Sequence, residues 1–171
     1  MGAPLPALLA GLLDDLEARY PGRIWRDQPW IFSNAGGAMV QLKVLYASFR
    51  EYLLIFGTPI GTEGHSGRHL VAFDDVVLDG EIWYHGEGDL ERRVYRPGDV
   101  VVLERGDAAG IRVPDRVWML EYACGAIPLS LPFGLADSVF STLDVLGVVR
   151  TLRIFAVLAW RSILPLRSRR G

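Results

Sequence analysis

The segment Gly98-Asp99-Val100-Val101-Val102-Leu103-Glu104-Arg105-Gly106-Asp107 decides the fold class, because it places a short apolar strand between two Gly-Asp turns. Similar units fill the chain from about residue 30 to residue 128, where runs of Val, Ile, Leu, Tyr and Trp end at glycine, proline or aspartate. The clearest runs are residues 52–56, 81–85, 100–103 and 117–122. Short strands at this spacing predict a mainly β protein, either a closed barrel or a sandwich.

Extended to Ala109, the same segment resembles a degenerate second cupin motif, in which Gly-Asp is followed by a proline, a glycine and a metal-binding histidine. Glu104 stands at the proline position and Ala109 at the histidine position. The resemblance supports a cupin-like β-barrel but opposes a cupin metal site. We therefore expect no metal ion and no other cofactor.

Helical segments flank this barrel. Residues 7–19 predict a short amphipathic helix, whose apolar face packs on the barrel or on a membrane. The segment is too short for the roughly 20 apolar residues of a membrane span. After the barrel the pattern predicts helices at residues 133–146 and 148–164, with a break near Gly147. The chain thus divides into an N-terminal helix and lead-in (1–29), a barrel (30–130) and two C-terminal amphipathic helices (131–171).

The last predicted helix combines an apolar face with a basic stripe. Arg150, Arg153 and Arg161 fall on one side at helical spacing, and three arginines make a bilayer span costly. The pattern suits a helix lying in the membrane interface, and equally a helix packed on the barrel with a solvated basic face. Further positive charge follows at Arg167, Arg169 and Arg170, which favours an anionic surface.

Composition restricts the classes of partner. Half of the 171 residues are hydrophobic, which indicates a lipid-facing surface or a large apolar cavity. The net charge of -2 provides no electrostatic footprint for nucleic acid. The single cysteine, Cys124, excludes an internal disulfide framework.

Glu121 is the residue most indicative of chemistry, because it lies within the apolar run 118–122. A carboxylate buried there without a partner is costly, so it must be protonated, paired or exposed. Burial can raise such a pKa by up to roughly 3 to 5 units, and a carboxyl group that stays protonated near neutral pH can act as a general acid. The alternative is a carboxylate on the outer face of the strand, paired with an arginine.

Asp74 and Asp75 lie within another apolar run and must point to opposite faces if the run is a strand. One of them could enter the barrel while the other is solvated, or both could be exposed at a strand end. The segment 64–69, with His65, Ser66 and His69, could suggest metal binding or a nucleophile. Two glycines beside polar side chains favour a turn held by internal hydrogen bonds instead.

Several motifs together resemble the family of fungal C-8 sterol isomerases and sigma non-opioid receptors. They occur in the same order in that family and cover about residues 30–155. The matching segments are Asn34-Ala35-Gly36-Gly37, Tyr46-Ala47-Ser48, Glu51-Tyr52, Phe56-Gly57-Thr58, Gly64-His65-Ser66-Gly67-Arg68, Trp118, Glu121-Tyr122, Ile127-Pro128, Ala136-Asp137 and Phe140-Ser141-Thr142. Residues 61–65, His69, 131–134 and 141–144 are similar to the isomerases rather than to the receptors.

The resemblance implies a cupin-like barrel with an apolar ligand pocket, two membrane-facing C-terminal helices and a homotrimer. Glu121 and Asp75 match the family's carboxyl pair, and Tyr52 matches the tyrosine that bonds to it. We expect Glu121 and Asp75 to be catalytic. The side chains expected to contact the substrate are Tyr52, Leu54, Phe56, His69, Phe73, Ile82, Trp118 and Leu131.

The expected activity is that of a C-8 sterol isomerase, which shifts a sterol double bond from delta-8 to delta-7 by acid–base chemistry. The alternative is a sigma-receptor-like ligand-binding membrane protein without catalysis. Expected partners are a sterol, cationic amphiphilic amines and membrane lipid. The family's N-terminal transmembrane helix has no counterpart in this sequence, and Ala38 replaces a tryptophan of the receptors. We expect membrane association all the same, at the endoplasmic reticulum in a eukaryote and peripherally in a bacterium.

Overall fold

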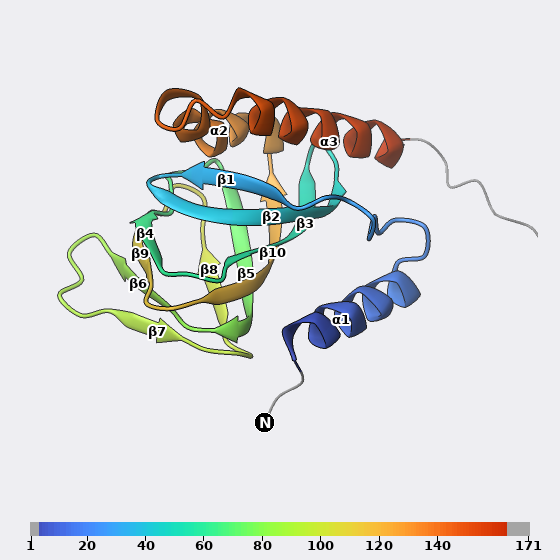
Figure 1. Cartoon of the computed structure of the whole chain (residues 1–171). Coiled ribbons are helices and arrows are strands. Elements are labelled where there is room, and N and C mark those ends of the chain that lie inside the picture. The colour runs from blue at the N-terminus through green and yellow to red at the C-terminus, as the bar shows by residue number, and fades with distance from the viewer. Residues whose placement is uncertain (1–3, 164–171) are drawn as a thin grey trace, which may run out of the picture.

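The structure, a computed structural model, describes residues 4–163 (Figure 1). Ten strands form the body of the molecule, with one α-helix before them and two after them. In chain order the elements are α1 (Leu5–Arg19), β1 (Ile31–Ala35), β2 (Ala38–Ala47), β3 (Glu51–Thr58), β4 (Thr62–His65), β5 (Val71–Gly80), β6 (Ile82–Gly86), β7 (Arg93–Tyr95), β8 (Val100–Leu103), β9 (Ala109–Val113), β10 (Val117–Gly125), the 3-10 helix η1 (Ile127–Leu129), α2 (Leu131–Phe140) and α3 (Val145–Ile163).

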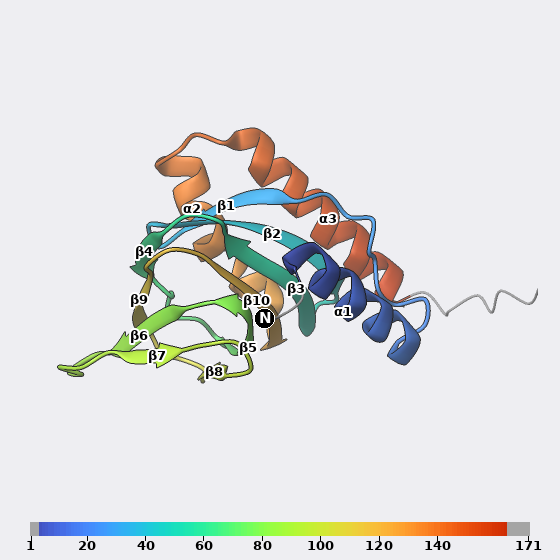
Figure 2. The same cartoon turned by 60° about the horizontal axis from the view of Figure 1, so that its bottom comes forward.

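The strands form two antiparallel sheets that face each other around a common interior (Figure 2). The six-stranded sheet has the order β1-β2-β3-β10-β5-β8, and the four-stranded sheet has the order β4-β9-β6-β7. Non-consecutive strands are neighbours at the centre of each sheet, so residues distant in sequence meet in the interior. The predicted barrel of short strands is confirmed.

Apolar side chains fill this interior in two clusters. The cluster beneath the C-terminal helices consists of Val44, Ala47, Tyr52, Leu54, Val71, Phe73, Ala123, Ile127, Phe155 and Leu158. The cluster at the other end consists of Val77, Ile82, Tyr84, Val101, Ala109, Val113, Val117 and Met119. Along β10, Ala123 belongs to the first cluster and Met119 to the second. Glu121 lies between them in the sequence, and therefore between two apolar layers.

Helix α1 covers the outer face of the six-stranded sheet. Leu13 is buried there together with Ile24, Leu45, Ile55 and Trp118. The helix begins two residues before the predicted range, because a proline is tolerated in the first turn of a helix. Of the two surfaces considered for its apolar face, the barrel is the one that the structure shows.

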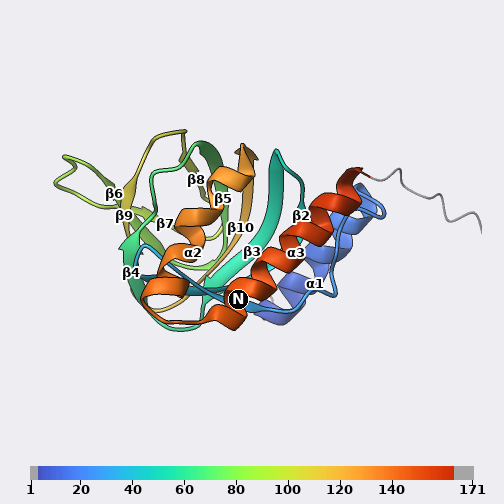
Figure 3. The ribbon, with the colours of Figure 1, turned by 90° about the horizontal axis from the view of Figure 1, so that it is seen from above.

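Helices α2 and α3 lie across β1 and β2 at one end of the barrel, as the view from above shows (Figure 3). The predicted break near Gly147 is wrong, because the chain leaves the helix after Phe140 and starts α3 at Val145. The Asp144 carboxylate accepts a hydrogen bond of 2.8 Å from the Gly147 N–H and thereby caps α3. The break is thus fixed by a capping aspartate, whereas the glycine lies inside the first turn of α3.

Candidate functional site

A cavity of about 210 Å³ lies inside the barrel beneath α2 and α3. Its wall combines side chains from both sheets with side chains from the two C-terminal helices. The lining residues are Ser33, Ala35, Ala38, Val40, Leu42, Tyr52, Leu54, Phe56, His65, Ser66, His69, Phe73, Asp75, Tyr84, Leu103, Ile111, Glu121, Ser130, Leu131, Phe133, Gly134, Leu135, Thr151 and Phe155. Because most of these are apolar, the carboxyl groups of Asp75 and Glu121 stand out among the lining side chains.

The register of three strands brings the carboxyl pair together. Glu121 on β10 lies directly opposite Asp75 on β5 and opposite Leu54 on β3. Alternation along β5 buries Asp75, whose exposed fraction is 3%, while Asp74 is exposed on the outer face. The structure therefore decides which of the two adjacent aspartates enters the barrel.

Tyr52 holds Glu121 in place. Its hydroxyl donates a hydrogen bond of 2.6 Å to Glu121 Oε1, from the strand on the other side of β10. The Tyr52 ring packs edge-to-face on Phe155 of α3 with 5.6 Å between ring centroids. Burial and the nearby carboxyl groups raise the pKa of Tyr52 well above its usual value, so the hydroxyl stays protonated and remains a donor. Tyr52 thus contacts both Glu121 and helix α3.

The electrostatics of the pair favour one shared proton. Burial raises the pKa of Asp75 well above its usual value, and the charge of Glu121 and a hydrogen bond to it raise it further. Burial also raises the pKa of Glu121, against the hydrogen bonds from Tyr52 and Asp75, which lower it. Asp75 Oδ1 is buried and has no donor among the described residues, which is costly for an ionised carboxylate. A proton held by Asp75 and donated to Glu121 removes this conflict.

Most of the other residues expected at the site line the same cavity, namely Leu54, Phe56, His69, Phe73 and Leu131. Trp118 does not line the cavity, contrary to the expectation that it contacts the substrate. Its ring lies on the opposite face of β10 from Glu121 and packs with the residues under α1 and edge-to-face on Trp30. Ile82 is also removed from the expected set, because it is buried in the second apolar cluster, away from the cavity wall.

His69 forms one side of the cavity beside α2. Its ring packs edge-to-face between Phe73 and Phe133, at centroid distances of 5.0 and 4.8 Å. Burial lowers the pKa of His69, so the neutral imidazole is favoured at neutral pH. Gly67 has a φ of +87°, and a Cβ there would come within 2.3 Å of His69 Nε2 and 2.5 Å of the Phe133 ring. The absence of a side chain at Gly67 therefore allows the rings of His69 and Phe133 to pack against each other.

Tyr84 of β6 is a cavity residue that the sequence analysis did not select. It is 7% exposed and reaches the interior from the four-stranded sheet, beside Ile111 of β9. Burial raises the pKa of Tyr84 well above its usual value, and the charges of Asp75 and Glu121 raise it further. The signal was present in the sequence, because Ile82 and Tyr84 alternate with Trp83 in the run 81–85 and so share the inner face.

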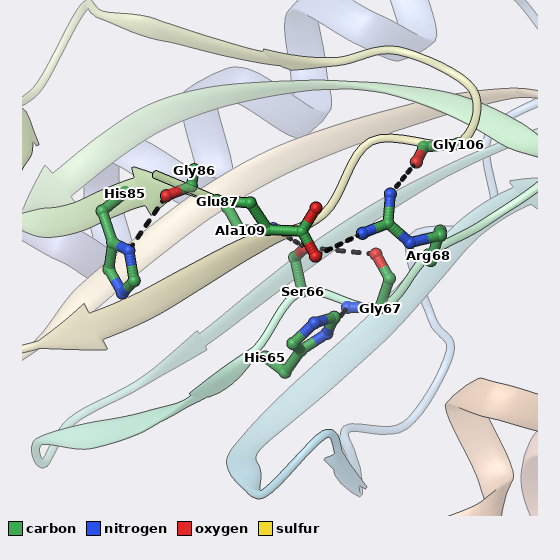
Figure 4. Close-up of polar contacts among 9 residues, drawn as sticks. All are labelled: His65, Ser66, Gly67, Arg68, His85, Gly86, Glu87, Gly106 and Ala109. Carbon is green, nitrogen blue, oxygen red and sulfur yellow. Dashed lines mark hydrogen bonds and ion pairs between the residues drawn. The ribbon is translucent and has the colours of Figure 1, made fainter. Parts of the chain in front are cut away.

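The turn around residues 64–68 serves the fold, as its two glycines predicted (Figure 4). The Ser66 hydroxyl accepts a hydrogen bond of 2.9 Å from the Ala109 N–H and donates to the Gly67 carbonyl. His65 Nδ1 accepts from the Gly67 N–H at 2.9 Å. Arg68 donates to the Gly106 carbonyl and to the Glu87 carboxylate. These internal contacts occupy the Ser66 hydroxyl and His65 Nδ1, and both residues also form part of the cavity wall.

Ala109, the residue at the position of a cupin metal-binding histidine, is buried in β9 and bonded to this turn. Within residues 4–163 no three His, Cys, Asp or Glu side chains are grouped as a metal site would need.

Helix α3 presents three stripes. Gly147, Thr151, Phe155 and Leu158 are buried against the barrel. Val145, Val149, Leu152, Trp160 and Ile163 are exposed apolar side chains on a second stripe. Arg150 and Arg153 lie beside them on a third, together with the exposed Leu146 and Val157. None of the helices within the described range is both long and apolar enough to cross a bilayer.

The third arginine of the predicted basic stripe has a partner. The guanidinium of Arg161 lies 3.7 Å from the centroid of the Trp25 ring, at the end of the lead-in after α1. Arg161 thus ties α3 to the N-terminal segment through a cation–π contact. Arg167, Arg169 and Arg170, which were expected to add positive charge, lie outside the described residues.

Comparisons with known proteins agree with the sequence motifs. The family described as "ERG2 and Sigma1 receptor like protein" matches residues 2–165. Sigma non-opioid intracellular receptor 1 of Xenopus tropicalis is 40% identical over 84% of this chain and 66% of its own length. C-8 sterol isomerase of Pyricularia oryzae is 44% identical over 81% of this chain and 63% of its own length. The chain thus spans about two thirds of the length of these relatives.

Solved structures with a similar fold have low sequence identity. Polyketide cyclase RemF of Streptomyces resistomycificus has a TM-score of 0.52 at 17% identity, over 60% of this chain and 78% of RemF. A RmlC-like cupin of Shewanella frigidimarina has a TM-score of 0.51 at 16% identity, over 61% of this chain and 91% of that protein. These likenesses confirm the cupin-like barrel and bear on the fold alone.

Proposed function

Because the chain belongs to the ERG2 and sigma-1 receptor like family, we propose that it is a C-8 sterol isomerase, which moves a sterol ring double bond from the delta-8 to the delta-7 position. The observation that carries this proposal is the Asp75–Glu121 pair, two carboxyl groups on neighbouring strands that line a mostly apolar cavity. The reaction needs a proton given to one ring carbon and another proton removed two carbons away, and the pair supplies both functions.

In this mechanism the pair protonates C9 of the substrate, and the electrons of the C8–C9 double bond form the new C–H bond. The cation left at C8 is stabilised by the negative charge that remains on the pair, in a cavity that excludes most water. The pair then accepts a proton from C7, and the electrons of that C–H bond form the C7–C8 double bond. The pair ends with the same number of protons as at the start.

The cavity must enlarge for this substrate. Pockets for drug-sized ligands measure about 300–1,000 Å³, whereas this cavity measures about 210 Å³. Its helical wall consists of Leu131, Phe133, Leu135, Thr151 and Phe155 from α2 and α3. We infer that the sterol enters by displacing these helices, which is also the side where exposed apolar residues gather.

The exposed apolar stripe of α3, flanked by Arg150 and Arg153, supports association with a membrane interface. An apolar sterol partitions into lipid, so a mouth facing the bilayer gives it a route that avoids water. Homotrimer formation is proposed from family membership alone.

The rival function is a ligand-binding protein without turnover, and it is supported by identities near 40% to sigma receptors. Both functions use Glu121, because a carboxylate that stabilises a cation also binds an ammonium ligand. The test is sterol analysis of an isomerase-deficient yeast that carries this gene. Delta-7 sterols should reappear with the wild-type gene and not with Glu121→Gln. Persistence of delta-8 sterols with a well-expressed wild-type protein that binds amines would favour the rival.

A further inference from the structure

A second, more polar cleft, the outer cleft, opens between β8 and the strands β6, β7 and β9, next to the inner cavity. It is lined by residues of β6, β7, β8 and the loops beside them, including His85, Glu87, Arg93 and Asp107, all of which are exposed. Because these side chains are charged or polar and reach solvent, the cleft is accessible to water. The inner cavity, in contrast, is lined mostly by apolar side chains.

The two spaces share part of their walls. Tyr84 and Leu103 line both the inner cavity and the outer cleft, and no other residue of the two linings is shared. Of these two, only Tyr84 carries a polar group. Its ring packs edge-to-face on Tyr95, which lines the outer cleft alone, with 5.7 Å between centroids.

The Tyr84 hydroxyl differs from that of Tyr52. Tyr52 is held on Glu121 by a hydrogen bond of 2.6 Å, whereas no side-chain hydrogen bond within residues 4–163 involves the Tyr84 hydroxyl. On the inner side, Asp75 is 3% exposed, and its Oδ1 has no donor among the described residues. A hydroxyl without a fixed partner thus shares the cavity with a carboxyl oxygen that lacks one.

We propose that Tyr84 is a proton-relay residue, whose hydroxyl connects the Asp75–Glu121 pair with water in the outer cleft. Among the described residues no direct hydrogen bond joins the Tyr84 hydroxyl to the pair, so a water inside the cavity bridges the gap. Through this water the hydroxyl passes its proton to the carboxylate of the pair as it takes one from a cleft water, and the reverse transfer returns the proton to water. Tyr84 remains neutral at the start and the end, and the hydroxide left in the cleft is neutralised by bulk solvent.

The relay rests on the proposed isomerase function and adds to it. Without a relay, the proton taken from C7 stays on the pair and is delivered to C9 of the next substrate. With a relay, this proton is exchanged for one from water between turnovers. A bound sterol fills the cavity beneath the helices, which leaves the Tyr84 wall as the polar path to solvent.

The first test measures proton return during turnover, with a delta-8 sterol deuterated at C7 and purified protein in ordinary water. We expect little deuterium at C9 of the delta-7 product with the wild type, and a several-fold rise with Tyr84→Phe. Tyr95→Phe is the matched control, because it removes a hydroxyl from the neighbouring ring, which lines the outer cleft alone, and it should behave like the wild type. Equal deuterium return in wild type and Tyr84→Phe would contradict the relay.

The second test needs no turnover, so it separates failure of the relay from failure of the proposed function. Infrared spectroscopy follows the band of the protonated carboxyl group after transfer of the protein into D₂O. Tyr84→Phe should slow the isotope shift of this band by about tenfold, the factor that losing one ordinary hydrogen bond produces in a rate. An unchanged exchange rate, or an equal slowing in Tyr95→Phe, would overturn the proposal.

Discussion

The inner face of β10 and the turn at residues 64–68 both carry residue types that perform chemistry, but the structure uses them in opposite ways. In the turn, the polar groups of Ser66 and Arg68 are bonded to the protein itself. In the barrel, Asp75 keeps one carboxyl oxygen without a donor, and two carboxyl groups share an apolar space. A satisfied cluster stabilises a fold, whereas an unsatisfied buried cluster retains free energy that a reaction can use.

The largest effect on turnover is expected at the carboxyl pair. Glu121→Gln keeps the size of the side chain and the hydrogen bond from Tyr52 but removes the charge that stabilises the cation and accepts the proton. General acid–base catalysis contributes roughly 100- to 10,000-fold, so the turnover rate should fall by at least about 100-fold. Gas chromatography of sterol products measures the loss, and circular dichroism checks the fold. A folded variant with full activity would remove Glu121 from the mechanism.

Substitutions in the turn should affect stability and leave turnover unchanged. Ser66→Ala removes an acceptor for the Ala109 N–H and a donor to Gly67, which should lower the free energy of unfolding by about 1–3 kcal/mol. The turnover rate per folded molecule should stay close to that of the wild type. Urea denaturation and the same sterol assay test both halves. A severe loss of turnover with unchanged stability would place Ser66 at the chemistry and erase the contrast between the two regions.

The carboxyl pair should also make stability depend on pH. The pKa of Asp75 is raised in the folded state, so above the ordinary carboxyl pKa the folded protein binds more protons than the unfolded one. Stability therefore falls as pH rises from the ordinary value towards the raised one, by up to about 1.4 kcal/mol per pH unit for one proton. Asp75→Asn cannot ionise and should flatten this slope, whereas Asp74→Asn on the outer face should not. Denaturation at several pH values measures the slopes, and equal slopes in all three proteins would contradict a raised Asp75 pKa.

The smallest effect is expected on the outer surface of α3. Arg153→Gln removes one positive charge beside the exposed apolar stripe and should weaken binding to anionic vesicles by about 1 kcal/mol, in a salt-dependent manner. Arg161 is less suitable for this test, because its substitution also breaks the contact with Trp25. Vesicle sedimentation with Arg105→Gln as control, a substitution at an exposed position after β8, measures the change. Equal binding of both variants would show that α3 does not rest on lipid.

The sequence predicted the strands, the flanking helices and the central pair, because alternating apolar runs and family motifs are local signals. It could not choose between Asp74 and Asp75, since that choice depends on the register of β5 against β10. Trp118 was misplaced because a motif residue was taken as a contact although alternation puts it on the opposite face from Glu121. Tyr84 was missed because its importance arises only where two cavities share a wall. The start of α3 depends on a single capping bond of Asp144.

The most direct measurement is turnover of a delta-8 sterol by the purified protein in D₂O, with the product analysed by mass spectrometry. The shared-proton mechanism predicts a delta-7 sterol in amounts that exceed the protein many times over, with one deuterium at C9 when the pair exchanges its proton with solvent between turnovers. Quantitative recovery of the unlabelled delta-8 sterol from a folded protein that binds amine ligands would contradict it, and the carboxyl pair would then serve binding alone.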